Sequence, residues 1–163
     1  MRKITFILFA MLTGSIFAQD SGTATVRAEI VEAINIENGT ELYFGKIDAA
    51  GGGNVRVAAD GTRTFSNNDM KITSSETPTA ALFKVTAAKD ISYKVSIPSI
   101  ALTLASAPDM NVSFTHAVGT DDDGSIIGTG AEQDLYVGGL LSVASGQDAG
   151  EYTGTVTVTV SYE

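Results

Sequence analysis

The end of the chain shows its clearest hydrophobic pattern. Valine and tyrosine alternate with threonine and serine, and the apolar parity consists of Val156, Val158, Val160 and Tyr162. Because successive side chains of a β-strand point to opposite faces, this pattern predicts a strand with one buried and one solvated face. The β-branched residues also favour an extended backbone. A single strand cannot bury its apolar face alone, so other segments must supply partners.

Alternation with period two recurs along the chain and predicts further strands. One runs from Thr23 to Ile30 and continues on the same parity to Ile36, with Glu32 as an interruption that predicts a bulge or a change of sheet. The other predicted strands cover residues 41–47, 55–57, 62–65, 81–87, 91–97, 100–104, 112–118 and 135–143. A glycine-rich loop is expected between the last two, over residues 119–130.

The turns between these segments indicate the fold class. Signals such as Asn38-Gly39 and Asp60-Gly61 separate the strands at short intervals, and no helical periodicity follows residue 18. This pattern predicts an all-β fold, an antiparallel β-sandwich of about nine or ten strands. A closed barrel is the alternative, because periodicity does not distinguish the two.

The first 18 residues differ from the rest of the chain. Met1-Arg2-Lys3 is basic, residues 4–17 are mostly apolar, and Ala18 is a small residue suited to cleavage. This order is typical of a secretory signal peptide, and the apolar run is shorter than the ~20 residues that span a bilayer. We expect a signal peptide over residues 1–18 and one exported domain over residues 19–163, without a membrane span. An N-terminal membrane anchor is the alternative.

Charge and cysteine content narrow the classes of function. The chain has 19 Asp and Glu against 10 Lys and Arg, and Arg2 and Lys3 belong to the predicted signal peptide. An acidic domain repels phosphate backbones, so we expect no nucleic-acid partner. With one histidine and no cysteine, the chain has few ligands for zinc or copper. Its stability must come from burial and sheet hydrogen bonds rather than from disulfides.

One loop contains the candidate metal ligands, Asp121, Asp122 and Asp123. Carboxylates in a glycine-rich loop suit a hard cation such as calcium, with Glu132 or Asp134 as a further ligand. The spacing does not match a helix–loop–helix calcium site, because Gly130 occupies the position of the bidentate glutamate. Weak calcium binding and a solvated acidic turn are therefore the two interpretations, and no other cofactor is expected.

Few residues suit catalysis or glycan binding. His116 lies on the apolar parity of its strand, and no Gly-x-Ser-x-Gly motif supplies a nucleophile. We therefore expect a structural histidine, no catalytic residues and no enzymatic activity. The chain has no tryptophan, and glycan binding would depend on Tyr43 and Tyr136, whose parity points outward.

Two series of motifs resemble a known family in their order and spacing. The first runs Leu42-x-Phe44-Gly45-x-Ile47, Gly51 to Gly53, Asp60-Gly61, Phe83-x-Val85 and Tyr93. The second runs Leu135-x-Val137-Gly138-x-Leu140, Val143, Gly146-Gln147-x-Ala149-Gly150-x-Tyr152-x-Gly154 and Tyr162. Together they resemble the bacterial exported family called domain of unknown function 4402 (DUF4402). The resemblance implies an immunoglobulin-like sandwich, often from Gram-negative bacteria, with no established chemistry.

The unit Gly150-x-Tyr152-x-Gly154 has a structural interpretation. We expect positive φ at Gly150, at the corner before the last strand. The Tyr152 ring is expected to pack while its hydroxyl bonds back to the backbone. These three residues and Tyr162 are therefore predicted to be structural.

The C-terminus also resembles that of chaperone-assembled pilins. Those proteins end in an alternating strand with a penultimate tyrosine and a glycine fourteen places from the end, which here are Tyr162 and Gly150. The resemblance implies that each subunit completes its neighbour by adding a strand. The chain departs from pilins because it has no disulfide, and the short segment before Thr23 shows no pattern for an added strand.

These observations predict a non-enzymatic, exported protein with a structural or adhesion-type role at the cell surface or in the periplasm. Its expected partners are other copies of itself or surface proteins. One alternative is a pilus-like subunit that assembles by β-strand addition through its terminal strand. The other is a weak calcium- or glycan-binding module.

Overall fold

The computed structural model describes residues 20–118, 121–122 and 125–163. The predicted signal peptide over residues 1–18 lies outside this part of the chain. The chain divides after Ile30 into two units, and the second, Val31–Glu163, contains all of the described strands. We call this second unit the body.

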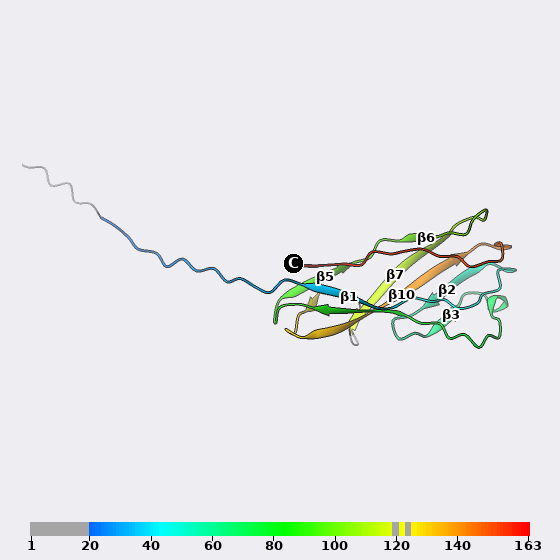
Figure 1. The fold of residues 1–163 in the computed structure, drawn as a ribbon, viewed down its shortest axis with the longest axis horizontal. Helices are drawn as coiled ribbons and strands as arrows, with labels where there is room; N and C mark the ends of the chain where they lie inside the picture. Colours follow the sequence, from blue (N-terminus) through cyan, green and yellow to red (C-terminus); the bar gives the residue numbers. More distant parts are fainter. Residues whose placement is uncertain (1–19, 119–120, 123–124) are drawn as a thin grey trace, which may run out of the picture. The chain divides into compact units, whose positions relative to one another are not determined.

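The body is all-β, with one short 3-10 helix (Figure 1). In chain order its elements are β1 (Asn35–Thr40), β2 (Gly53–Val57), β3 (Arg63–Phe65), η1 (Asn68–Met70), β4 (Ala81–Thr86), β5 (Ser92–Ser96), β6 (Ile100–Leu102), β7 (Met110–Val118), β8 (Asp121–Asp122), β9 (Ile126–Ile127), β10 (Glu132–Val143) and β11 (Thr159–Tyr162). The predicted all-β class is confirmed. The described strands outnumber the prediction because the expected loop over residues 119–130 contains β8 and β9.

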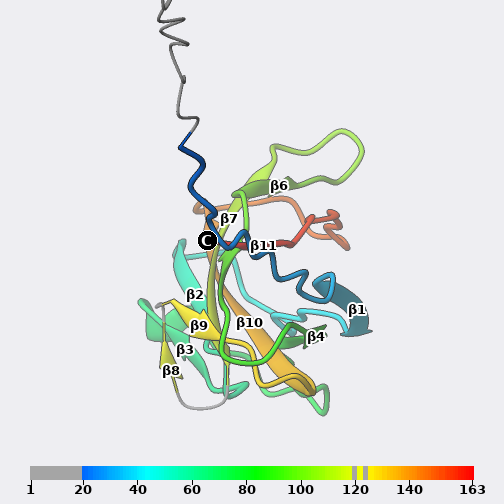
Figure 2. The same cartoon turned by 90° about the vertical axis from the view of Figure 1, so that its left-hand side faces the viewer.

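The strands form two antiparallel sheets. In the large sheet, β10 pairs along one edge with β7 and along the other with β4 and then β2. β1 extends this sheet beyond β4, β3 extends it beyond β2, and β6 and β8 pair with β7. The small sheet has the order β11-β5-β9. β10, orange in Figure 2, lies near the middle of the body.

Apolar side chains from both sheets meet in one core cluster. Val85 of β4, Leu135 of β10 and Tyr93 of β5 are each fully buried in it. Because the first two belong to the large sheet and Tyr93 to the small one, the sheets pack face to face. The sandwich predicted from the alternating pattern is therefore confirmed.

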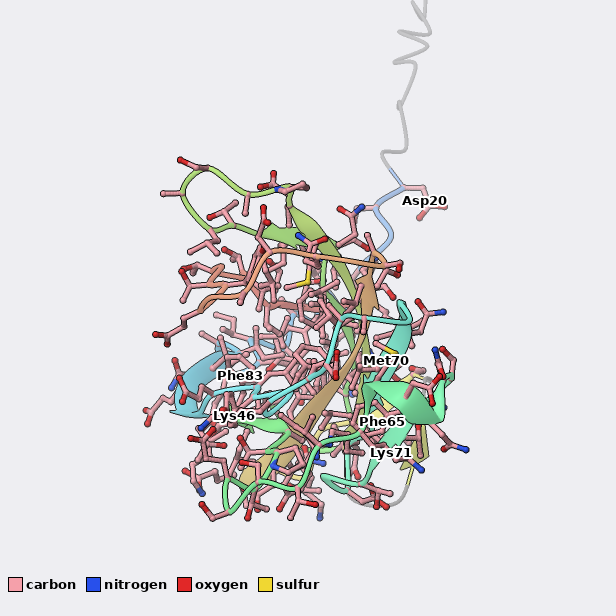
Figure 3. The ribbon with its side chains drawn as sticks, turned by 90° about the vertical axis from the view of Figure 1, so that its right-hand side faces the viewer. Asp20, Lys46, Phe65, Met70, Lys71 and Phe83 are labelled. Atoms are coloured by element: carbon pink, nitrogen blue, oxygen red, sulfur yellow. The ribbon has the colours of Figure 1, made fainter. Side chains whose placement is uncertain are left out.

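A second cluster lies against the other end of the large sheet. Val55 and Val57 of β2 are fully buried in it, as their parity predicts. Met70 of η1 is also fully buried, and Phe65 packs against the same cluster (both labelled in Figure 3). Met70 thus anchors the irregular segment after β3 to the core, whereas Ile72 is 38% exposed and does not.

Gly138 lies where β10 changes its neighbour. Residues 132–137 pair with β4, and residues 139–143 pair with β2. A Cβ at Gly138 would collide with the backbone carbonyl of Val57. The glycine therefore lets the end of β2 approach an uninterrupted β10.

Three predicted strands were wrong in extent. Residues 23–30 form no strand and are exposed. Residues 41–47 make only an isolated bridge between Tyr43 and Thr79, although Phe44 is buried. The last strand is hydrogen-bonded over Thr159–Tyr162 rather than from Thr155. Alternation describes the side chains of a segment, but it does not show whether a partner strand lies beside its backbone.

Candidate functional site

One edge of the small sheet is open along β11. β11 pairs with β5 from Thr159↔Ser96 to Tyr162↔Tyr93, and no described residue pairs with its other edge. Residues 154–158, just before it, have no backbone hydrogen bond to a described residue. In Figure 1 this last segment (red) crosses the body and ends beside β5. We call residues 154–162 the β11 edge.

Four side chains along the β11 edge form an apolar row, Val156, Val158, Val160 and Tyr162. The last three pack against the cluster that contains Tyr93 and Leu135. All four are only half-buried, although their parity is the predicted one. Ile34 and Ile36, at the start of the body, contact the same cluster and are also half-buried. The core is therefore incompletely covered along this row.

The hydroxyl of Tyr162 joins three parts of the body. It accepts a hydrogen bond from the backbone N–H of Ala88 at 2.8 Å and donates one to the carbonyl of Glu32 at 2.9 Å. Ala88 follows β4, and Glu32 precedes β1. The penultimate tyrosine thereby connects the last strand to the entry of the first strand and to the β4–β5 turn. The sequence pattern predicted a structural tyrosine but not these partners, which lie 74 and 130 residues away.

Tyr152 holds the corner that leads into the β11 edge. Its hydroxyl donates a hydrogen bond to the Asp148 carbonyl at 3.0 Å and accepts one from Nε2 of Gln147 at 3.0 Å. Its ring packs against the cluster around Val55 and Val57. These contacts fix the direction in which the last segment leaves the corner.

The two glycines beside Tyr152 allow close approach of the neighbouring segment. Gly150 has φ of 159°, which is close to extended, and a Cβ there would collide with the side chain of Leu104. A Cβ at Gly154 would lie 2.9 Å from the carbonyl oxygen of Ala101. Glycine is required for space at Gly154, where the obstacle is backbone. At Gly150 the obstacle is the end of the Leu104 side chain, and φ is positive as expected, although close to 180°.

Residues 20–30 belong to the first of the two units and contain no helix or strand. Thr23–Ile30 keeps its alternating pattern, and all of its side chains are exposed. Val26 is 92% exposed and Ile30 is 97% exposed. None of these residues has a backbone hydrogen bond to another described residue. The predicted first strand is therefore an alternating segment without a described partner.

The comparison with protein families identifies the body. The family model of the domain of unknown function DUF4402 matches residues 34–162. The chain belongs to the DUF4402 family. The match confirms the resemblance seen in the motifs, and it begins after Thr23–Ile30. No curated protein matches the chain, and no solved structure matches it either. Among the described residues, no helix is long and apolar enough to cross a membrane.

The acidic loop of the DUF4402 domain is described only in part. Asp121 and Asp122 form β8 and pair with the end of β7. Their side chains, and the whole of Asp123, lie outside the described part of the chain. Elsewhere in residues 20–163, the described side chains include no group of three His, Asp or Glu that could hold a metal ion. Calcium binding at the three aspartates stays a prediction.

The two further ligands expected for calcium are engaged by a lysine. The Lys84 ammonium donates hydrogen bonds to Glu132 and, at 3.4 Å, to Oδ1 of Asp134. The hydrogen bonds that Lys84 donates to Glu132 and Asp134 raise the pKa of Lys84 above its usual value. All three side chains are exposed to solvent, so this group is a surface ion pair across β4 and β10.

His116 lies inside the large sheet rather than at a loop cluster. It is half-buried in β7, opposite Val137 of β10. A shallow hollow on β6, β7 and β10 is lined by apolar side chains and by Ser99, Asn111, Ser113 and Ser142. No described histidine or carboxylate lines this hollow.

Tyr43, one of the two tyrosines expected to face outward, binds a carboxylate. Its hydroxyl donates a hydrogen bond to Glu76, whose other oxygen forms an ion pair with Lys46 at 2.9 Å. The hydrogen bond with Tyr43 and the nearby Lys46 ammonium lower the pKa of Glu76 below its usual 4.5. The same hydrogen bond raises the pKa of Tyr43. Glycan binding by Tyr43 and Tyr136 stays a prediction.

Proposed function

We propose that this protein is a non-enzymatic structural subunit that acts outside the cytoplasm and joins other chains by accepting a β-strand at the β11 edge. The observation that carries the proposal is the open outer edge of β11, together with residues 154–158, whose backbone bonds to no described residue, beside the half-buried apolar row. The partners are other copies of the chain, and no cofactor is required.

A strand added at this edge would improve two features of the body at once. The open edge presents N–H and C=O groups that another backbone can bind in the geometry of a sheet. The apolar row offers alternating side chains on one face, which is how added strands gain specificity. Each valine that passes from half-buried to buried contributes in proportion to the apolar area removed from water.

Other observations support the remaining parts of the proposal. The basic, apolar and small-residue order of residues 1–18 supports export. The placement of His116 within the ladder of β7, opposite Val137, supports a structural histidine rather than a catalytic one. The acidic charge of the chain favours solubility and disfavours nucleic acid as a partner.

The test measures assembly and the β11 edge together. The full chain is refolded at a series of concentrations, and its oligomers are separated by size-exclusion chromatography with light scattering. Hydrogen exchange then compares the amides of residues 154–162 in the oligomer and in the monomer. We expect oligomers in which these amides exchange at least about tenfold more slowly.

The amides of β3 provide the control, because β3 is an edge strand of the large sheet and should keep its exchange rates. A chain that stays monomeric at every concentration would overturn the proposal. Oligomers with unchanged exchange at residues 154–162 would overturn it as well.

A further inference from the structure

We infer that the strand added at the β11 edge is Thr23–Ile30 of a second copy of this chain. Its apolar parity, Ala24, Val26, Ala28 and Ile30, would face the core beside the apolar row. This inference rests on the proposed function and names the partner for the same edge.

The exposure of Thr23–Ile30 is the first argument. Val26 and Ile30 are more than nine-tenths exposed, which is a large apolar exposure for a segment of only eight residues. The other exposed large apolar side chains among the described residues are Val31, Ile72, Ile127 and Leu140, and these are 38–59% exposed. Among the described residues, Thr23–Ile30 alone combines strongly exposed apolar side chains with strand-like alternation and an unpaired backbone.

The match in length and pattern is the second argument. An extended segment of eight residues spans about 26 Å at the rise of a β-strand. Thr23–Ile30 presents four apolar side chains on one parity, and the row from Val156 to Tyr162 also presents four. The opposite parity of the segment carries Thr23, Thr25, Arg27 and Glu29, which suit a face that remains in water.

The connection to the body explains why the strand should come from a second copy. The Glu32 carbonyl accepts a hydrogen bond from the Tyr162 hydroxyl at one end of the apolar row, and residues 34–36 run from there into the core. A preceding segment could cover the row of its own copy only by reversing direction within residues 31–34. That sequence, Val31-Glu32-Ala33-Ile34, has no Gly, Pro, Asn or Asp to form a tight turn.

The arrangement implies a particular kind of assembly. Each copy donates Thr23–Ile30 and accepts a strand at its β11 edge, and these are two different surfaces. Such an interface is heterologous, so copies join head to tail into an open chain rather than a closed symmetric dimer. A ladder of sizes is therefore expected instead of a single oligomer.

The first experiment compares two variants of the full chain, Val26→Asp and Thr25→Asp. Both add one negative charge to neighbouring exposed positions, so neither should disturb the body, which circular dichroism verifies. We expect Val26→Asp to raise the concentration needed for assembly about 100-fold, because it removes an apolar side chain and places a charge against the core. The Thr25→Asp variant should assemble nearly like the parent chain.

The second experiment uses Val26→Asp as a receiver with an intact β11 edge. A fluorescent peptide with the sequence Thr23–Ile30 should bind it and raise its melting temperature. A matched peptide that carries Val26→Asp should bind about 100-fold more weakly. Failure of the parent peptide to bind would overturn the inference.

The outcomes separate the inference from the proposed function. If Val26→Asp assembles like the parent and residues 154–162 remain protected in its oligomers, strand addition is supported but the donor is another segment, and the inference is overturned. If the parent chain is a monomer whose amides at residues 23–30 are protected, the segment pairs within its own copy. The inference that the strand comes from a second copy is then overturned. A parent chain that never assembles and has no protected amides at residues 23–30 overturns both.

Discussion

Removal of the Tyr162 hydroxyl tests how strongly one side chain holds the body together. In the Tyr162→Phe variant the buried N–H of Ala88 loses its acceptor, whereas the exposed Glu32 carbonyl can bind water instead. A buried donor without a partner costs about 1–3 kcal/mol, and the exposed carbonyl adds little. We therefore expect a loss of about 2 kcal/mol in the free energy of unfolding.

Tyr93→Phe is the matched control for this prediction. Tyr93 lies directly opposite Tyr162 in the small sheet and is fully buried, and its hydroxyl has no hydrogen-bond partner among the described residues. Burial accordingly raises the pKa of Tyr93. Removal of an unpartnered buried hydroxyl should leave stability unchanged or improve it. The two variants lose the same atom at paired positions, so the difference between them isolates the hydrogen bonds.

Urea unfolding followed by circular dichroism measures both variants. We expect a lower midpoint with an unchanged slope for Tyr162→Phe, and a melting temperature about 8 °C below that of the parent. Equal stability of Tyr162→Phe and the parent would refute the reasoning. So would an equal loss in Tyr93→Phe, because the effect would then follow from any tyrosine in the pair.

Three further predictions concern the core, the strand junction and one surface carboxylate. Leu135→Ala removes a fully buried side chain and should cost about 2–5 kcal/mol in urea unfolding. Gly138→Ala places a Cβ against the backbone of β2, so we expect a lower melting temperature than for alanine at Gly22, where a Cβ meets no neighbour. The lowered pKa of Glu76, due first to Tyr43 and then to Lys46, means that its ionised form stabilises the body above pH 4.5. The parent should therefore be more stable than Glu76→Gln at neutral pH, and thermal melts should show this difference disappearing as the pH falls below 4.5; a constant difference would contradict the assignment.

The strand-addition proposal gives a physical meaning to two features that look unrelated in the sequence. The apolar row around Val158 is only half-buried in the body, and the apolar parity around Val26 is exposed in a separate unit. Each is unfavourable in water when it stands alone, and each has the alternation that the other requires. Assembly would remove both sets of apolar side chains from water at a single interface.

The sequence by itself determined the class of the fold and the inward parity of most strands. Val55 and Val57 are buried as their alternation predicts, and so are Tyr93 and Leu135. These features follow from the sequence because side-chain direction in an extended chain depends only on position along that chain. The DUF4402 motifs could also be recognised from the sequence, because their glycines and aromatic residues occur at fixed spacings.

Only the tertiary structure decided which alternating segments are strands. Thr23–Ile30 and Thr159–Tyr162 have similar patterns, yet the second pairs with β5 and the first pairs with no described residue. A strand requires hydrogen bonds from a backbone far away in the sequence, and alternation carries no information about that partner. The two bonds of the Tyr162 hydroxyl could not be predicted for the same reason, because they depend on where the chain places Glu32 and Ala88 in space.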